Sequence, residues 1–158
     1  MTTDTVTVGV VLERRTPNSP WIDVLWRPCS VLPGAPDLAP WTRLDGSARA
    51  ERFYAGAFQL ELHRTDTPTY RDNLFTGRPL LWVALRPADA GVTVVGVTAD
   101  PAEGESWTEA GSDIVDTVPM PSEIETLLAA FVAEHHVERV FVKRKRRRWA
   151  SDEDEDMA

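Results

Sequence analysis

The stretch Thr5-Val-Thr-Val-Gly-Val-Val-Leu-Glu-Arg14 places an apolar side chain at every second position from Val6 to Leu12. The positions between them carry mainly polar or small residues, up to Glu13. A period of two is typical of a β-strand that buries one face, as strands of antiparallel sheets do. The sequence therefore predicts a strand over Thr5–Arg14.

Apolar runs bounded by glycine, proline and small polar residues continue along the chain. They predict five further strands, over Trp21–Leu32, Glu51–His63, Leu80–Leu85, Val92–Thr98 and Ile114–Val118. The connection Ala88-Asp-Ala-Gly91 between two of these strands is typical of a hairpin.

The predicted strand over Glu51–His63 has its own pattern. We expect one face to carry Tyr54, Phe58, Leu60 and Leu62. Gly56 lies in the middle of the run, where a bulge, a sharp bend or a tight turn is the usual reason for a glycine.

Three helices are predicted by their start signals. Asp66 or Thr67, followed by Pro68, opens a short helix that runs to about Leu74 with Gly77 beyond it. Asp100 and Pro101 open an acidic helix that ends at Gly111.

The third helix begins at Ser122, which with Glu125 forms the pattern of a capping box. Its apolar residues recur at helical spacing and predict a single buried stripe. The stripe consists of Ile124, Leu127, Leu128, Phe131, Val132 and His135.

Together these elements predict an α+β fold in which a mostly antiparallel curled sheet, or a small barrel, is covered by a C-terminal amphipathic helix. A pleckstrin-homology-like domain has this order of elements, which is an analogy of fold and carries no function. We expect one globular domain over residues 1–142 and a charged flexible tail over residues 143–158.

Composition limits the class of protein. The 158 residues are 42% hydrophobic and include six tryptophans, enough for a core, and the net charge of −8 disfavours general nucleic-acid binding. Cys29 is the single cysteine, so no internal disulfide can form.

The N-terminus lacks the basic and apolar regions of a signal peptide, and no apolar run approaches the roughly 20 residues of a membrane span. We therefore expect a cytoplasmic protein without membrane contact.

The reactive side chains do not form a recognisable catalytic or metal-binding motif. His135 and His136 are adjacent on a helix and so point about 100° apart, which disfavours chelation of one ion. Carboxylates such as those from Asp100 to Glu109 are common near a helix N-terminus, where the helix dipole favours negative charge. A lone cysteine such as Cys29 most often packs as a small apolar side chain. We expect no catalytic residue, no bound metal and no cofactor.

One polar connection follows the strand that ends at His63. A polar loop on a rigid sheet is a plausible recognition surface, because it offers donors and acceptors at fixed positions. The candidate surface consists of His63, Arg64, Asp66, Tyr70, Arg71, Asp72 and Asn73.

The C-terminus carries opposite charges in blocks. Six consecutive cations, residues 143–148, precede Trp149 and then five consecutive anions, residues 152–156. Residues 1–142 hold 11 Lys and Arg against 20 Asp and Glu, a net charge of −9. Solvated disorder is one interpretation of such a segment, and docking of a protein partner is the other. The candidate docking residues are Lys143, Arg144, Lys145, Arg146 and Trp149.

Several stretches together resemble the bacterial domain of unknown function 3305 family, over about residues 6–146. They are Val8-Gly-Val-Val-Leu-Glu-Arg-Arg15, Ser19-Pro-Trp21, Trp26-Arg-Pro28, Val31-Leu-Pro-Gly34, Phe53-Tyr-Ala-Gly56, Leu60-Glu-Leu-His-Arg-Thr-Asp66, Tyr70-Arg-Asp-Asn-Leu74, Leu81-Trp-Val83, Thr98-Ala-Asp-Pro-Ala-Glu-Gly-Glu105, Val118-Pro-Met-Pro121, Phe131-Val-Ala-Glu-His-His-Val-Glu138 and Lys143-Arg-Lys-Arg146. The family has no established activity. Its genes often accompany those of molybdenum- or tungsten-dependent formate dehydrogenases and their maturation chaperones, which implies a role beside such enzymes.

Three functions follow as expectations. The first is a non-catalytic accessory protein that assembles, stabilises or delivers a molybdopterin-dependent oxidoreductase such as formate dehydrogenase, with an oxidoreductase subunit or maturation factor as partner. The second is a domain or enzyme that binds a small anionic ligand such as the pterin cofactor, which requires Arg14, Arg15, Arg64 and Arg71 to converge on one concave pocket. The third, nucleic-acid binding through the basic run, is disfavoured by the acidic body.

Overall fold

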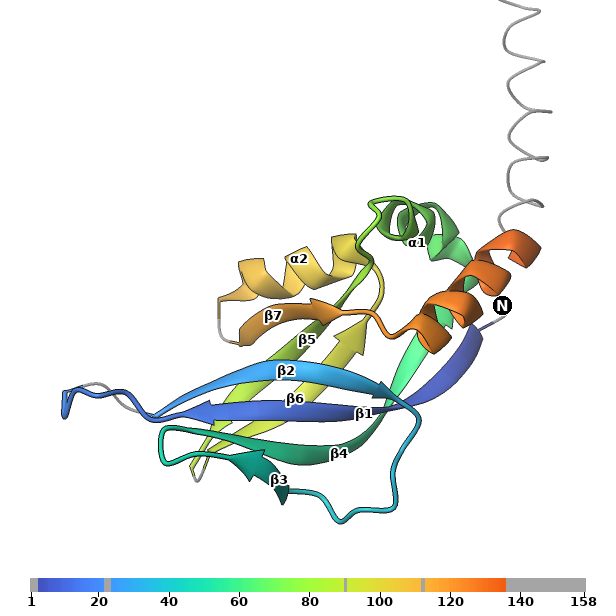
Figure 1. Cartoon of the computed structure of the whole chain (residues 1–158). Helices are drawn as coiled ribbons and strands as arrows, with labels where there is room; N and C mark the ends of the chain where they lie inside the picture. Colours follow the sequence, from blue (N-terminus) through green and yellow to red (C-terminus); the bar gives the residue numbers. More distant parts are fainter. Residues whose placement is uncertain (1–2, 22–23, 90, 112, 136–158) are drawn as a thin grey trace, which may run out of the picture.

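The computed structural model describes residues 3–21, 24–89, 91–111 and 113–135 of the chain. Its elements are β1 Thr3–Arg15, β2 Leu25–Pro33, β3 Thr42–Gly46, β4 Ala50–His63, η1 Arg64–Asp66, α1 Thr67–Leu74, β5 Leu80–Ala88, β6 Gly91–Thr98, α2 Pro101–Ala110 and β7 Ile114–Pro119. A last helix covers residues 122–135 and is orange in Figure 1.

The strands form two antiparallel sheets. One has the order β2-β1-β4-β3 and the other the order β6-β5-β7. β2 lies beside β7 and β4 beside β6, so the two sheets enclose a common interior. The α+β class, the curled antiparallel sheet and the C-terminal helix are confirmed. Within the described ranges the sheets stay separate, so the structure is not a closed barrel.

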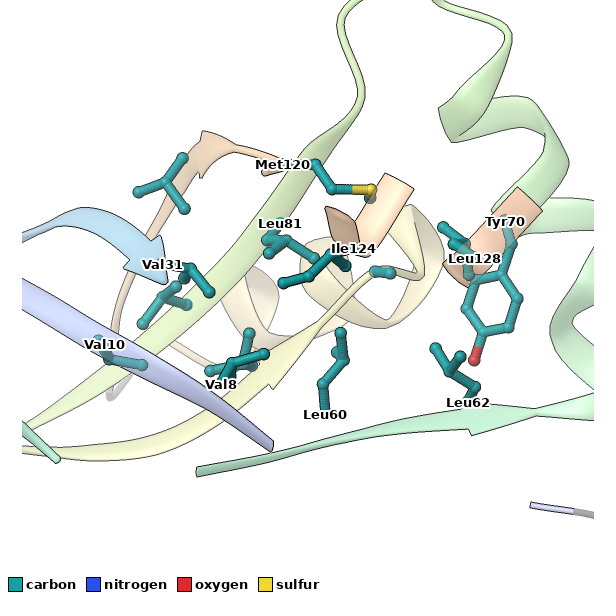
Figure 2. Close-up of a cluster of buried hydrophobic side chains, with 14 of the residues drawn as sticks. Val8, Val10, Val31, Leu60, Leu62, Tyr70, Leu81, Met120, Ile124 and Leu128 are labelled. Carbon is teal, nitrogen blue, oxygen red and sulfur yellow. The ribbon is translucent and has the colours of Figure 1, made fainter. Parts of the chain in front are cut away.

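The core lies between the sheets and under the last helix (Figure 2). Val8, Val10 and Leu12 of β1 are fully buried, as their alternation predicts. Figure 2 shows Ile124 and Leu128 of the helix pointing into the same cluster. The helix therefore covers apolar side chains that the sheets would otherwise expose, and it stabilises the fold by removing that area from water.

A β-bulge changes the expected face of one residue. The pairing of β1 with β4 shifts by one position between Val10 and Val11, opposite Gly56, whose φ is +132°. Such a shift reverses the side on which side chains lie. A Cβ on Gly9 would lie 2.9 Å from Tyr54 Cε1, so the Tyr54 ring covers Gly9 on the face away from the main core. The prediction that Tyr54 shares a face with Leu60 is therefore wrong.

One strand was not predicted, and another is shorter than expected. β3 pairs with β4 at the edge of its sheet, and its sequence, Thr-Arg-Leu-Asp-Gly, is largely exposed and lacks apolar alternation. A strand that buries no face leaves no period of two in the sequence. β2 begins at Leu25 and not at Trp21, whose side chain is 91% exposed.

The two short helices have the predicted bounds and stop signals. α1 covers Thr67–Leu74, and the φ of Gly77 beyond it is +83°. The Asp100 side chain accepts a hydrogen bond of 2.9 Å from the Ala102 backbone N–H, which caps α2. Gly111 ends α2 in the left-handed conformation, with φ of +77°.

The last helix carries most of its predicted stripe inward. Five of the six positions are buried, and Leu127 is half exposed.

The capping box expected at the start of this helix is not formed. The Glu125 N–H donates 2.9 Å to the Pro121 carbonyl, and the Ser122 hydroxyl bonds the Glu123 carboxylate at 2.9 Å. Pro121 therefore holds the N-cap position, since its carbonyl accepts the first helical bond.

Candidate functional site

The predicted recognition surface begins at the end of β4 and continues through α1. Tyr70 is 1% exposed, and its hydroxyl accepts a hydrogen bond of 2.9 Å from the His63 backbone N–H. Burial raises the pKa of the Tyr70 phenol to about 12. Tyr70 therefore ties α1 to the end of β4 and is not available to a partner.

Asn73 has a comparable internal role. Its Nδ2 donates to the carbonyl oxygens of Leu80, at 2.8 Å, and of Ala99, at 2.9 Å. Its Oδ1 accepts from the Leu80 N–H at 2.9 Å, and the residue is 3% exposed. Asn73 therefore joins α1 to the start of β5 and the end of β6. The assignment of Tyr70 and Asn73 to a recognition surface is corrected, because both side chains satisfy backbone groups inside the protein.

The other five residues lie nearer the surface. His63 is half buried, and its Nε2 lies 3.8 Å from Glu61 Oε2. Arg64 and Asp66 belong to the η1 turn, and Asp72 is exposed. The Arg71 guanidinium lies 4.9 Å from the centre of the exposed Phe75 ring. These five residues are at least partly exposed, and none of them lines the two pockets described below.

The buried phenol gives a pH-dependent prediction. The Tyr70 pKa is raised from 10.0 to about 12, so above pH 10 the unfolded state releases a proton that the folded state keeps. We expect the free energy of unfolding to fall between pH 10 and 12, by roughly 2 to 3 kcal/mol from this group. Urea unfolding at several pH values measures the decline. Tyr70→Phe should be less stable at neutral pH and should decline less in this range; an equal decline in both proteins would contradict the assignment.

The arginines proposed to meet an anionic ligand lie at two ends of the molecule. Thr3 pairs with His63, next to Arg64, whereas Arg14 and Arg15 lie at the other end of the 13-residue strand β1. Strands rise about 3.3 Å per residue, so roughly 35 Å separates the two groups. They do not meet on one concave pocket.

A cluster that the sequence did not indicate lies at the Arg14 end. Trp26 of β2 contacts Trp41 and Phe53, with ring centres 5.8 Å apart in both pairs. The Arg14 guanidinium lies 5.3 Å from the centre of the Phe53 ring and 5.9 Å from that of Trp26. We call Arg14, Trp26, Trp41 and Phe53 the aromatic cluster. Cation–π contacts of this kind stabilise an arginine beside aromatic rings.

A pocket of about 290 Å³ opens beside the aromatic cluster. It is lined by Trp26, Trp41, Ala88, Gly91 and Val92, and so lies between β2 and the β5–β6 hairpin. Strand register places Trp26 and Glu51 on either side of Arg14, and the packing of the second sheet supplies Ala88, Gly91 and Val92. No signal in the sequence links positions so far apart.

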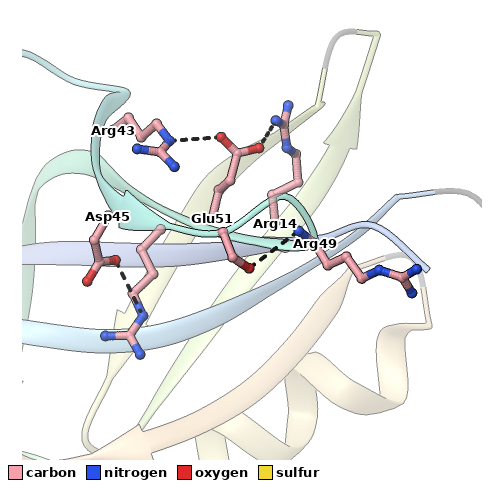
Figure 3. A network of polar contacts seen from close by, with 7 residues as sticks. Arg14, Arg43, Asp45, Arg49 and Glu51 are labelled. Carbon is pink, nitrogen blue, oxygen red and sulfur yellow. Dashed lines mark hydrogen bonds and ion pairs between the residues drawn. The ribbon is translucent and has the colours of Figure 1, made fainter. Parts of the chain in front are cut away.

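Two guanidinium groups converge on one carboxylate beside this pocket (Figure 3). Arg14 and Arg43 both donate to Glu51, Arg43 at 2.9 Å. The hydrogen bonds from Arg14 and then Arg43 hold the Glu51 pKa below its usual range. The Glu51 side chain is 20% exposed, against 38% for Arg14 and 50% for Arg43, so the guanidinium groups form most of the surface.

A second hollow lies at the opposite end, between the start of β1 and the last helix. Its volume is about 520 Å³, and Val6, Leu62, Leu127 and Phe131 contribute its apolar lining. Asp4 and Glu134 also line it. Phe131 is the one aromatic residue among those that line this hollow, whereas two tryptophans line the pocket at the Arg14 end, and we take the Arg14 end as the candidate site.

The remaining candidates have structural surroundings. The His135 ring packs on Phe131 at 4.5 Å, as its place on the stripe predicts. Asp100 caps α2, and Cys29 is half buried in β2. Within the part of the chain that the structure describes, no three His, Cys, Asp or Glu side chains are grouped to hold a metal ion. The tail residues Lys143, Arg144, Lys145, Arg146 and Trp149, like His136, lie outside the described residues.

Comparison with known proteins gives one match. A family described as "Protein of unknown function (DUF3305)" matches residues 7–147. No curated protein and no solved structure matches the chain. In the described ranges, none of the helices is both long enough and apolar enough to cross a membrane.

Proposed function

The chain belongs to the DUF3305 family, and on this premise we propose that it is a non-catalytic accessory protein of a molybdopterin-dependent oxidoreductase such as formate dehydrogenase. It acts by docking on a protein partner, which is an oxidoreductase subunit or a maturation factor. We place this interaction in the cytoplasm.

The observation that carries the proposal is the apolar surface at the Arg14 end. Trp21 is 91% exposed, Leu25 54% and Trp41 42%. Large exposed apolar side chains are typical of protein-binding surfaces, where tryptophan and arginine contribute a large share of the binding free energy, and Trp41 also lines the pocket. This surface favours a binding protein over an enzyme with an enclosed active site.

The identity of the partner rests on the resemblance alone. The resemblance implies that genes of the family often accompany those of formate dehydrogenases and their maturation chaperones, and we propose that the chain acts on such an enzyme. The net charge of −9 on residues 1–142 disfavours nucleic acid as an alternative partner.

The alternative, a domain that binds the pterin cofactor or another anionic ligand, has less support. It requires several arginines around one pocket, and Arg64 and Arg71 lie far from Arg14 and Arg15. The pocket of about 290 Å³ lies at the lower limit of small-molecule sites, which span roughly 300 to 1,000 Å³.

Affinity purification of the tagged full chain tests the proposal. The cells should be grown under conditions that induce the oxidoreductase, with the tag alone as the control. We expect a subunit of the oxidoreductase or one of its maturation factors to be recovered with the chain and absent from the control. Recovery of neither class under inducing conditions would contradict the proposal.

Deletion of residues 143–158 gives a further prediction. The segment offers two large apolar side chains, Trp149 and Met157, among charges, too little apolar area to offset the entropy of ordering the chain. We therefore expect the melting temperature to stay nearly unchanged while binding of the partner weakens. Differential scanning calorimetry measures the first effect, and a fall of more than a few degrees would show that the basic run packs on the acidic body instead.

A further inference from the structure

The pocket of the aromatic cluster has the size and lining of a site for one large apolar side chain. Its lining combines two indole rings with Ala88, Gly91 and Val92. Burying an apolar side chain against such a lining removes apolar area from water and so favours binding. The pocket is open at the surface because Trp41, one of its walls, is 42% exposed.

The backbone of Trp41 supports a functional role for this wall. Its φ is +69°, in the left-handed region that bulky residues rarely adopt. Such a conformation is strained, and strained residues of this kind cluster at binding sites. The N–H of Trp41 donates to the Tyr54 carbonyl, which holds the backbone, and the Trp41 ring packs edge-on against Trp26. The wall is therefore held in place before any partner binds, and binding loses less entropy.

Two groups of charged pairs at this end of the molecule, one on each face of the sheet, have their carboxylates less exposed than their guanidinium groups. On one face of the sheet, Glu51 is the less exposed member of its pairs with Arg14 and Arg43. On the other face, the Glu13 side chain is 9% exposed and meets Arg15 and Arg27, which are 54% and 55% exposed. In both groups the surface consists mainly of guanidinium groups.

The balance of charge at this end differs from that of the whole chain. The described segments 13–15, 25–27 and 42–53 hold six arginines and three carboxylates, while the net charge of the chain is −8. Asp89 of the β5–β6 turn adds a fourth carboxylate nearby, and the excess of arginine remains. A locally basic surface on an acidic protein favours an acidic partner.

From these observations we infer that the pocket binds an apolar side chain carried by an acidic segment of the partner protein. The inference rests on the proposed function and adds the chemistry of the segment that is recognised. The apolar side chain enters between Trp26 and Trp41, and the flanking carboxylates pair with the exposed guanidinium groups of Arg14 and Arg43. A second copy of the chain is a poorer occupant, because it would bring the same arginines together.

A defined peptide tests the inference on the full chain. The probe is a fluorescein-labelled peptide in which leucine and phenylalanine are flanked by glutamates, and fluorescence anisotropy measures its binding. We expect Trp41→Ala to weaken binding about tenfold or more and Arg43→Gln to weaken it several-fold. We expect added salt to weaken binding to the unaltered chain, since the exposed charges are screened.

The matched control is Phe75→Ala, which removes an exposed aromatic ring at the other end of the molecule. It should bind the peptide as the unaltered chain does. A peptide with glutamine in place of glutamate should bind much more weakly. Because Arg43 is half exposed at an edge strand, Arg43→Gln keeps the test valid if Trp41→Ala does not fold.

Several outcomes would overturn the inference. Absence of peptide binding to the unaltered chain would do so, as would equal binding of the glutamine peptide or an equal loss in Phe75→Ala. Tighter binding by the full chain with Trp149→Ala would assign the pocket to the chain's own C-terminus and not to a partner.

Two outcomes separate this inference from the proposed function. If purification recovers the oxidoreductase equally with Trp41→Ala and the unaltered chain, the proposed function stands and this site is excluded. If the peptide binds as expected but no such protein is recovered, the site stands and the proposed function fails.

Discussion

Phe131→Ala should lower the free energy of unfolding by about 3 to 5 kcal/mol, the usual cost of emptying the place of a buried phenylalanine. Phe131 is 4% exposed and lies between two rings, with centre-to-centre distances of 6.2 Å to Tyr70 and 4.5 Å to His135. The substitution leaves a cavity where the last helix meets α1, and the contacts of both rings are lost. The effect combines lost burial with lost packing.

Urea unfolding followed by tryptophan fluorescence measures this change. For a chain of this length, each kcal/mol corresponds to about 2 to 4 °C in melting temperature, so a fall of roughly 10 °C is expected. Leu127→Ala is the matched control, because Leu127 lies on the same helix and is 50% exposed. A loss for Leu127→Ala as large as that for Phe131→Ala would show that the helix buries a different face.

Asn73→Ala should have the second large effect, a loss of about 3 kcal/mol or more. The substitution leaves three backbone groups without their partner, the N–H and carbonyl of Leu80 and the carbonyl of Ala99. A buried polar group that loses its hydrogen bond costs about 1 to 3 kcal/mol. The start of β5 and the end of β6 should then exchange amide hydrogens faster, which hydrogen exchange detects at Leu80.

Asp72→Ala is the matched control for Asn73. The two residues are adjacent on α1 and have similar helix propensity, but Asp72 is exposed. We expect Asp72→Ala to change stability by less than about 0.5 kcal/mol. If Asn73→Ala costs no more than this control, its hydrogen bonds do not hold α1 against the sheets.

Local patterns in the sequence were sufficient for most of the elements. The bounds of α1, the cap of α2 and the buried face of β1 all depend on residues within a few positions of each other. These elements were predicted correctly because the interactions that favour them act between neighbouring residues and are the same in the folded protein. They are proline in the first turn of a helix, glycine beyond the last turn and alternation in a strand. The stripe of the last helix was predicted for the same reason, with Leu127 as the exception.

Local patterns failed where a distant segment decided the outcome. The side on which Tyr54 lies depends on a shift in pairing with β1, more than 40 positions away in the chain. The burial of Tyr70 and Asn73 depends on β4, β5 and β6, so two polar residues that looked suited to a surface serve as internal tethers. Hydrogen bonds between segments reverse what polarity alone suggests.

The sequence by itself determined the α+β class, the order of the elements, the C-terminal helix and membership of the DUF3305 family. The tertiary structure alone decided that the strands form two sheets, and that Arg14, Trp26, Trp41 and Phe53 meet at one end of them. The physical reason is the range of the interactions. Period and capping act between neighbours along the chain, whereas a surface for a partner is made by strand register, which brings together residues that share no local signal.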